Sequence, residues 1–294
     1  MAAEWKGKSR GTVLGYKIFL FCIKKIGLPS AYFILYFVAA YFCFFAKDST
    51  KSTYYYFRKR LHYSKFKSIL SLYRSYFVFG QTIIDKIAIS SALKSKFTYD
   101  FDGIEHIKEI LKQKKGGILI SAHLGNFEIA EHFFGKLEEN DFISLLTTNN
   151  EHTGIKNYLD SVTKKSNIKI ILIKEDLSHI FEINAALTRN EIVCVTGDRF
   201  MKNSQYLKQE LLGKEAKFPA GLFHICSRLT VPVLFVYVMK ETRKHYHLYA
   251  RTAQVKHRNA KALLKEYTQS LEEMLNKYPL QWFNYFDFWD VNKK

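Results

Sequence analysis

The stretch GGILISAHLGNFEIAEHFF, residues 116–134, decides the fold class and raises the first chemical question. Residues 117–122 form an apolar run of strand length that follows a glycine pair, and this pattern predicts a buried strand. The run leads directly into His123, and a carboxylate follows at Glu128. A buried strand that ends in a titratable ring indicates a functional edge of a sheet.

The same strand pattern alternates with helical patterns through the rest of residues 96–294. Further strands are predicted at 142–147, 168–173, 191–196, 232–239 and 246–250, and helices at 104–114, 126–138, 153–165, 177–190, 219–230 and 259–277. Such alternation is typical of an α/β domain whose largely parallel sheet is covered by helices. Ligands of such sheets bind at the carboxyl ends of the strands, where His123 is expected.

Residues 1–95 have a different composition, which predicts an N-terminal membrane-anchoring unit. Residues 26–46 contain no charged side chain over 21 positions, about the length that crosses the hydrocarbon core of a bilayer. Gly27 and Pro29 separate this run from the apolar, lysine-containing stretch before it, so two helices are expected. Residues 51–95 carry apolar residues at helical spacing with Lys and Arg between them, which predicts basic amphipathic helices.

The orientation of the apolar run is left open by the residues around it. Basic side chains flank it on both sides, so the positive-inside rule gives no direction. A helix that spans the bilayer and a helix pair that lies in the membrane plane, with both ends on the cytoplasmic face, both fit. A signal peptide is disfavoured because the run is long, starts late and lacks a small-residue cleavage site. A buried helix of a soluble core is the remaining alternative.

The net charge of +18 implies an anionic partner: nucleic acid, an acidic membrane surface or an acidic carrier protein. The aromatic residues lie in apolar runs and no nucleic-acid-binding signature is present, so no nucleic-acid partner is expected. The four cysteines lack a CxxC spacing and predict small buried residues in a reducing compartment. A nucleotide cofactor and a serine hydrolase are not expected, because no P-loop, dinucleotide fingerprint or GxSxG occurs.

His123 and Glu128 together suit general base catalysis. A carboxylate bonded to the far nitrogen of an imidazole orients the ring and stabilises the imidazolium that forms when it removes a proton. Residues five apart on one helix point about 140° apart, so His123 must lie in a turn and Glu128 early in the next helix. Gly125 permits an irregular backbone in that turn, and Asn126 is a suitable N-cap. A structural core histidine is the alternative.

Two further polar clusters follow or precede predicted elements. Asp198 and Arg199 come just past a predicted strand, at the same kind of edge as the imidazole, where a guanidinium can hold phosphate or oxyanion oxygens. A structural salt bridge is the alternative there. Lys214 and Lys217 stand before a helix start predicted at Pro219, where a phosphate could bind. Lysines on a solvated loop are the alternative.

Four blocks of the sequence together resemble one protein family. SAHLGNFE resembles the His-x4-acid block of the lysophospholipid acyltransferase superfamily, in the His-x4-Glu form of the late acyltransferases of lipid A biosynthesis (lauroyl/myristoyl acyltransferase-like). TGDRF and the later LLGKEAKFPAG resemble the second block of that family. The closing YPLQWFNYFDFW is similar to its terminal pattern, although Asn284 stands where an aromatic residue is usual. The apolar opening resembles a branch encoded with aryl-polyene and flexirubin-type lipid pathways.

This resemblance, which runs nearly end to end, implies an acyltransferase of lipopolysaccharide biosynthesis. The expected donor is an acyl carrier protein thioester and the expected acceptor is a lipid hydroxyl. The expected place is the bacterial inner membrane, with the catalytic domain facing the cytoplasm. No metal or organic cofactor is expected. A lipid A precursor, an aryl-polyene or flexirubin-type glycolipid, and a lysophospholipid or aminolipid all stay open as acceptors.

The resemblance also implies roles for particular residues. His123 would be the general base and Glu128 its orienting partner. Gly125 and Asn126 would shape the turn, and Arg199 with Asp198 would bind acceptor phosphate or the developing oxyanion. Together with Lys214 and Lys217, which precede the predicted helix start, these residues form the expected substrate-binding set. Two alternatives of another class are a metal site made by His123, Glu128 and His132, which lacks a known spacing signature, and a non-catalytic basic membrane adaptor.

Overall fold

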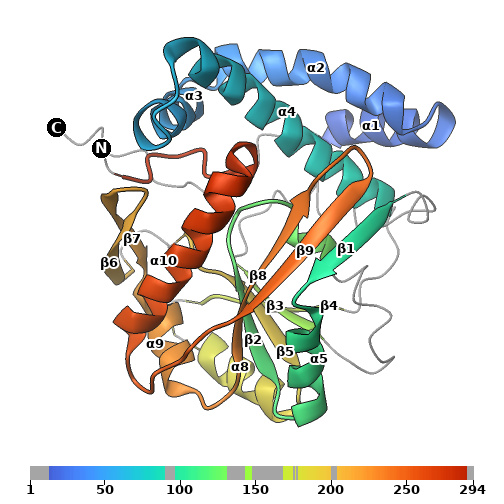
Figure 1. Ribbon diagram of the computed structural model, residues 1–294. Coiled ribbons are helices and arrows are strands. Elements are labelled where there is room, and N and C mark those ends of the chain that lie inside the picture. The colour runs from blue at the N-terminus through green and yellow to red at the C-terminus, as the bar shows by residue number, and fades with distance from the viewer. Residues whose placement is uncertain are drawn as a thin grey trace.

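A central sheet with helices on both faces carries a second group of helices across one of its ends (Figure 1). The computed structural model describes residues 13–89, 97–130, 143–147, 168–174, 176, 178–199 and 204–289. The predicted helix 153–165 lies outside these residues, as does most of the predicted helix 126–138.

In the described part of the chain, seven strands form the central sheet in the order β1-β9-β8-β2-β5-β3-β4. Their bounds are β1 (Thr98–Asp102), β2 (Gly117–Ser121), β3 (Ile143–Thr147), β4 (Ile168–Leu172), β5 (Ile192–Thr196), β8 (Val233–Lys240) and β9 (His245–Thr252). Every neighbouring pair is parallel except β8 and β9, which are antiparallel. The predicted α/β class with a largely parallel sheet is therefore confirmed.

Strand β2 lies in the middle of the sheet, and all five of its residues are buried. Ile118 and Ile120 belong to a core cluster with α10 (Ala260–Lys277) and α9 (Ala220–Arg228). Leu119 points to the other face, in a cluster with α5 (Ile104–Gln113). Side chains alternate across a strand, so an unbroken apolar run is what a strand covered on both faces requires.

The remaining helices of this layer complete the cover. α8 (His179–Thr188) packs beside β5 through Ile183 and Leu187. Asn259 caps α10, because its Oδ1 accepts a hydrogen bond from the amide of Ala262 at 3.0 Å. Such a cap satisfies one of the backbone donors that a helix start leaves unpaired.

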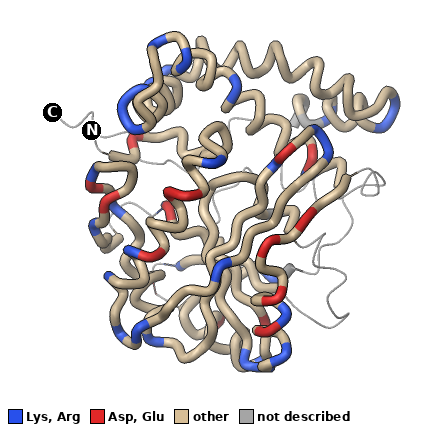
Figure 2. The backbone as a smooth tube through the Cα atoms, in the orientation of Figure 1, with Lys and Arg blue, Asp and Glu red and all other residues tan. Residues whose placement is uncertain are grey.

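The N-terminal residues form α1 (Val13–Lys25), α2 (Leu28–Phe45), α3 (Lys47–Tyr55), a π-helical turn (Tyr56–Arg60) and α4 (Lys65–Ile89). The two predicted helices around Gly27 are thus confirmed, as are helices within 51–89. By length and composition α2 could cross a membrane, with a mean hydropathy of 1.8 over 18 residues. Lys and Arg occur near both ends of α2 and not along it (Figure 2).

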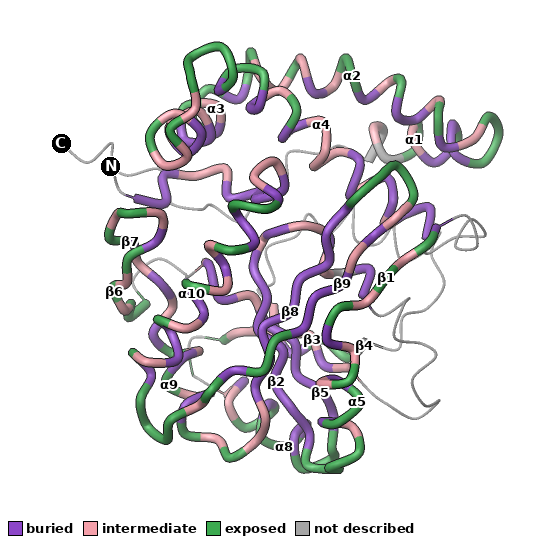
Figure 3. The backbone as a smooth tube through the Cα atoms, in the orientation of Figure 1, coloured by how far each residue is buried: buried purple, intermediate pink, exposed green. Residues whose placement is uncertain are grey.

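The N-terminal helices share a core with the α/β layer, and Figure 3 shows buried residues in both regions. Tyr56, Phe57 and Tyr76 belong to the same cluster of buried residues as Tyr267 of α10 and Trp282. The domain boundary predicted between residues 95 and 96 falls within 90–96, outside the described residues, and stays a prediction. The buried contacts nevertheless join the two regions into one hydrophobic core.

A two-stranded hairpin, β6 (Tyr206–Leu211) and β7 (Lys214–Pro219), was not predicted. Leu212 and Gly213 connect its strands with φ of 52° and 72°, the left-handed conformation of a two-residue hairpin turn. The edge strand β1 was also missed. β1 and β6 alternate exposed and partly buried residues, so neither contains the continuous apolar run that marked β2.

Candidate active site

The chain turns sharply after β2, and residues 122–126, the site turn, leave the sheet at its carboxyl edge. Gly125 has φ +70°, and a Cβ atom there would lie 2.2 Å from the carbonyl oxygen of Val238 in β8. The amide of Asn126 donates to that same oxygen at 2.7 Å. Only glycine combines this backbone conformation with such a close approach, so the predicted role of Gly125 in the turn has a direct physical cause.

A C-terminal segment, residues 279–289, closes over the site turn. The amide of Gly125 donates to the carbonyl of Gln281 at 2.9 Å, and the amide of Phe283 donates to the carbonyl of His123 at 2.8 Å. Leu124 and Trp282 form an antiparallel bridge. Backbone hydrogen bonds to β8 and to the C-terminal segment, both far from the site turn in the sequence, therefore hold the backbone around His123 in place.

The imidazole of His123 is bonded to Asp198, which follows β5 at the same edge of the sheet. Its Nδ1 lies 2.7 Å from Oδ1 of Asp198, and its amide donates to the two carboxylate oxygens at 3.1 and 3.0 Å. The Asp198 side chain is fully buried, whereas 29% of the His123 side chain is exposed. Because a carboxylate only accepts hydrogen bonds, Nδ1 carries the hydrogen and Nε2 is the basic nitrogen of the neutral ring.

Two groups of the C-terminal segment complete the surroundings of Asp198. The indole Nε1 of Trp282 donates to Oδ2 at 3.2 Å, and the amide Nδ2 of Asn284 donates to the same oxygen at 2.9 Å. Burial by itself would raise the pKa of the Asp198 carboxyl, but the charge and hydrogen bonds of His123, together with the charge of Arg199, lower it. The carboxylate therefore stays ionised at neutral pH.

Arg199 is directed at the C-terminal segment. Its Nε donates to Oδ1 of Asn284 at 2.7 Å and its Nη2 to the carbonyl of Phe283 at 2.7 Å. Burial lowers the pKa of the guanidinium to about 10, which still leaves it charged at neutral pH. Asn284 thus joins Arg199 to Asp198, and the electrostatic attraction between these two charges acts across that amide.

Asn126 does not have the capping role that its position predicted. It stands at the start of a 3₁₀ turn, Phe127–Ile129, and makes no side-chain cap. Its Nδ2 instead donates to the carbonyl of Thr82 in α4 at 2.9 Å. The prediction was wrong because the side chain is buried against a helix from the N-terminal region, where it satisfies a carbonyl oxygen.

Glu128 lies in the same 3₁₀ turn, but its side chain is outside the described part of the structure. Its predicted pairing with His123 therefore stays a prediction. His132, the third member of the metal alternative, is also outside the described residues. Among the side chains that the structure does describe, no group of three or more His, Cys, Asp or Glu residues is placed to hold a metal ion.

Lys214 and Lys217 lie in strand β7 and not in a loop before a helix. The ammonium of Lys214 donates to the hydroxyl of Tyr55 at 3.4 Å, and that of Lys217 lies 4.8 Å from the centre of the Tyr206 ring. Helix α9 begins directly after this strand, at Ala220. The predicted lysines therefore belong to the hairpin, and their role in substrate binding stays a prediction.

Trp282, Phe283 and Asn284 were not predicted as site residues, although they contact His123, Asp198 or Arg199. One signal was present: Asn284 departs from the aromatic residue expected at that position of the closing pattern. A polar side chain inside an aromatic run needs hydrogen-bond partners if it is buried. Asn284 is 6% exposed and finds both of its partners at the site.

Comparison with models of protein families shows the family. Residues 8–289 match the model described as bacterial lipid A biosynthesis acyltransferase, and the chain belongs to this family. The predicted acyltransferase activity is thereby confirmed, which favours an enzyme over the non-catalytic adaptor. No match was found among curated proteins.

Proposed function

We propose that this acyltransferase moves a fatty acyl group from an acyl carrier protein thioester to a lipid hydroxyl, with His123 as general base. The observation that carries the proposal is the 2.7 Å contact between Nδ1 of His123 and the buried carboxylate of Asp198. It orients a partly exposed imidazole at the carboxyl edge of a parallel sheet, where such folds bind their ligands.

The reaction follows from the chemistry of that pair. Nε2 of His123 removes the proton of the acceptor hydroxyl while its oxygen attacks the thioester carbonyl. A carbon–oxygen bond forms, and the tetrahedral intermediate collapses by breaking the carbon–sulfur bond. The proton then passes from the imidazolium to the departing sulfur, so that the carrier leaves as a free thiol.

Asp198 supports both proton transfers. It holds the ring with Nε2 as the basic nitrogen, and its negative charge stabilises the imidazolium that forms during attack. The charge is effective because the carboxylate is buried and bonded to Trp282 and Asn284, which orient it without neutralising it. We therefore assign the orienting role to Asp198.

Glu128 keeps the role of a second acid near the base, as its motif implies. If it also bonds the imidazole, its removal slows the reaction as removal of Asp198 does. If it acts elsewhere, on the acceptor or on the turn, the two variants will differ in their dependence on acceptor concentration. The two carboxylates are thus separable by kinetics.

The partners are inferred from charge and apolar surface. The net charge of +18 suits both an acidic carrier protein and anionic lipid headgroups. Helix α2 supports association with a membrane. Because the carrier is a cytoplasmic protein, the catalytic domain would face the cytoplasm from the inner membrane. A lipid A precursor is the acceptor that the family favours, and an aryl-polyene or flexirubin-type glycolipid is the second candidate.

The test is acyl transfer from a defined acyl carrier protein to extracted envelope lipids, followed by mass analysis of the product. Membranes carry the wild type, His123→Ala, Asp198→Asn or Glu128→Gln, with His106→Ala as a control for a partly exposed histidine on α5. We expect His123→Ala to reduce the rate by about 10²–10⁴-fold. Transfer by His123→Ala at the wild-type rate, at equal protein level, would refute the assignment of the base.

A further inference from the structure

The exposed apolar side chains are concentrated in the N-terminal helices. Fifteen large hydrophobic residues are exposed within the described chain, and twelve of them lie in residues 18–45 or the first turns of α4. They are Ile18, Phe21, Ile26, Phe33, Tyr36, Phe37, Tyr41, Phe44, Phe45, Phe66, Ile69 and Leu70. A cluster of this size on a soluble surface is unusual and marks a site of interaction.

The opposite face of α2 is a protein contact. Its buried residues recur at helical spacing: Leu28, Ala31, Tyr32, Leu35 and Ala39. This face packs along α4, where a Cβ atom at Gly80 would lie 2.2 Å from a methyl carbon of Leu35. The absence of a side chain at Gly80 therefore lets the two helices approach closely.

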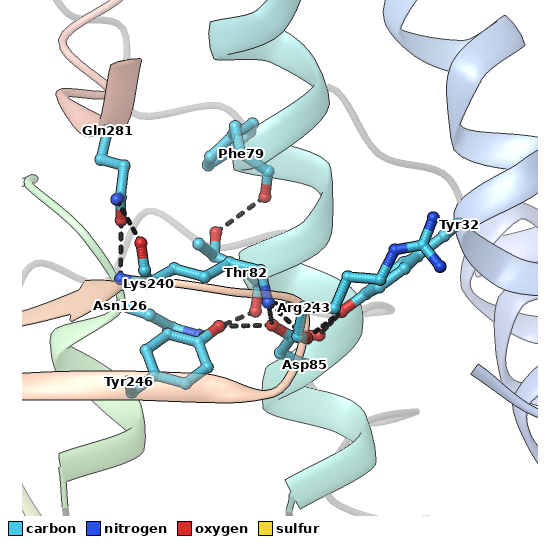
Figure 4. A network of polar contacts seen from close by, with 9 residues as sticks. All are labelled: Tyr32, Phe79, Thr82, Asp85, Asn126, Lys240, Arg243, Tyr246 and Gln281. Atoms are coloured by element: carbon cyan, nitrogen blue, oxygen red, sulfur yellow. Dashed lines mark hydrogen bonds and ion pairs between the residues drawn. The ribbon is translucent and has the colours of Figure 1, made fainter. Parts of the chain in front are cut away.

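A buried polar network attaches the same face to the sheet (Figure 4). The hydroxyl of Tyr32 donates to the carboxylate of Asp85, which is fully buried in α4. The ammonium of Lys240, at the end of β8, lies 2.5 Å from that carboxylate and also donates to the carbonyl of Arg243 at 2.8 Å. The hydroxyl of Tyr246 in β9 donates to the carboxylate as well. Three separate elements of the fold thus meet α2 at one buried charge pair.

This attachment opposes an orientation in which α2 crosses the bilayer. A spanning α2 would have to leave α4, which removes the Tyr32 donor from a buried carboxylate. If α4 instead moved with it, Arg74, Asp85 and Lys86 of that helix would enter the hydrocarbon region. Charged side chains there carry a large energetic penalty. Both routes are unfavourable, whereas a helix lying along the membrane surface keeps every contact.

We propose that α2 lies in the plane of one membrane leaflet, with its exposed aromatic face in the lipid and both of its ends on the same side. This inference rests on the membrane association proposed above. Lys24 and Lys25 precede α2 and Lys47 and Lys51 follow it. An in-plane helix places all four ammonium groups at one layer of anionic headgroups.

The site turn contacts the buried network that holds α2. Nδ2 of Asn126 lies 3.5 Å from the hydroxyl of Tyr246, a member of the buried network, and donates to the carbonyl of Thr82 on α4. A bilayer against the exposed face of α2 would therefore lie at the same end of the sheet as His123, with α2 and α4 between them (Figure 1). An acceptor lipid could then present its hydroxyl while its acyl chains remain in the leaflet.

The first test is the sidedness of the two ends of α2. In a full-length protein whose native cysteines are replaced by serine, single cysteines are introduced as Lys25→Cys, Lys47→Cys and, as a reference on the catalytic domain, Lys256→Cys. All three positions are exposed. Inside-out inner-membrane vesicles are labelled with a membrane-impermeant maleimide. We expect all three to be labelled from the same side, and labelling of the two ends of α2 from opposite sides would overturn the proposal.

The second test addresses the face itself. Phe37→Glu and Phe44→Glu place charges on the exposed side of α2, and Phe181→Glu on α8 is the matched control, because Phe181 is also an exposed apolar residue. Binding to vesicles of equal parts phosphatidylglycerol and phosphatidylethanolamine is measured by flotation. We expect at least a tenfold loss for the α2 variants only. Undiminished flotation of these variants would overturn the proposal, whereas failure of the wild type to float would remove the membrane association itself. Acyl transfer by the same samples tests the proposed reaction separately.

Discussion

The two ends of strand β5 each carry a buried carboxylate, and the two are surrounded differently. Glu191 precedes the strand and is 2% exposed. It accepts hydrogen bonds from Ser144 in β3, Lys169 in β4 and Arg189 at the end of α8. The side chains of Lys169 and Arg189 are about half exposed. The buried acid thus connects three elements of the fold, and its two cationic partners reach the solvent.

At the other end of the strand, Asp198 is bonded to one titratable ring, one indole and one amide. Neither of its side-chain donors from the C-terminal segment carries a charge, so the full attraction of the carboxylate acts on His123 and Arg199. Both ends of the strand thus contain a satisfied buried acid. Only the carboxyl end directs that acid at a group that can exchange protons with a substrate.

The comparison separates a stabilising carboxylate from one that we propose to act in catalysis, at the two ends of one strand. Burial by itself would raise the pKa of Glu191, but hydrogen bonds from its three partners lower it to about 2. The pKa of Asp198 is lowered too, chiefly by His123 against the effect of burial. A depressed carboxyl pKa is therefore common to both ends, and the identity of the partner decides what the acid does.

Among the variants that test this comparison, Asp198→Asn should have the largest effect. The variant keeps the shape of the side chain but removes the charge that holds the His123 tautomer, so we expect the acyl transfer rate to fall by about 10³–10⁴-fold. The rate is measured with saturating acyl carrier protein, and the fold is checked by circular dichroism. A folded variant that retains a tenth of the wild-type rate would contradict the assigned role.

Gly125→Ala should have the next largest effect on activity. The added Cβ would displace the site turn from Val238, and displacement of a catalytic group by about 1 Å costs on the order of 100-fold in rate. Gly213→Ala is the matched control, because Gly213 also has a positive φ but a Cβ there would meet no described atom within 4 Å. Equal rates for the two variants would show that the close approach at Gly125 is unimportant.

Glu191→Gln should lower the stability of the protein and leave its rate of acyl transfer unchanged, in contrast to the substitutions at the carboxyl end of the strand. We expect a loss of about 1–3 kcal/mol in the free energy of unfolding, because three donors then face a neutral amide. The rate per folded molecule should stay close to that of the wild type. Urea unfolding combined with activity measurements tests this. A loss of rate without a loss of stability would mean that Glu191 also serves the site.

The smallest effect concerns pH. Because the folded-state pKa of Glu191 is about 2 and its ordinary value is 4.5, its stabilising contribution is complete above pH 4.5 and is lost progressively as the pH falls towards 2. Glu191→Gln removes that contribution, so its stability should fall less steeply with acid than that of the wild type. The urea midpoint of unfolding is measured at pH 7 and pH 4 for both proteins. An equal fall in the midpoint for the wild type and the variant would contradict the prediction.

Much of the fold was predictable because its central strands are buried on both faces. β2, β5 and β8 read as continuous apolar runs, and α5 and α10 as amphipathic helices. β1 and the hairpin of β6 and β7 were missed because more exposed and more buried residues alternate along these strands, so they contain no continuous apolar run. The prediction that the N-terminal residues form a separate anchoring unit did not anticipate that Tyr56 and Tyr76 enter the main core. Such contacts depend on tertiary packing, which local periodicity does not encode.

The site was partly predictable because the strands that carry it were predictable. His123 and Asp198 follow neighbouring strands, so their position at one edge follows from the topology. Their direct bond does not, because it depends on a register between β2 and β5 that pairs Ser121 with Thr196. Asn284 belongs to a segment more than eighty residues further along the chain, and its departure from an aromatic pattern is the one local signal of its role.

The C-terminal segment has a consequence for the order of events during synthesis. The chain is made from its N-terminus, so the N-terminal helices leave the ribosome first and, if they bind a membrane as proposed, can meet it early. The backbone of His123 and the carboxylate of Asp198 gain their remaining partners only when residues 282–284 have left the ribosome. If α2 binds a bilayer as proposed, the nascent chain reaches the membrane before its proposed catalytic centre is complete, and acyl transfer can begin only where the acceptor lipid is found.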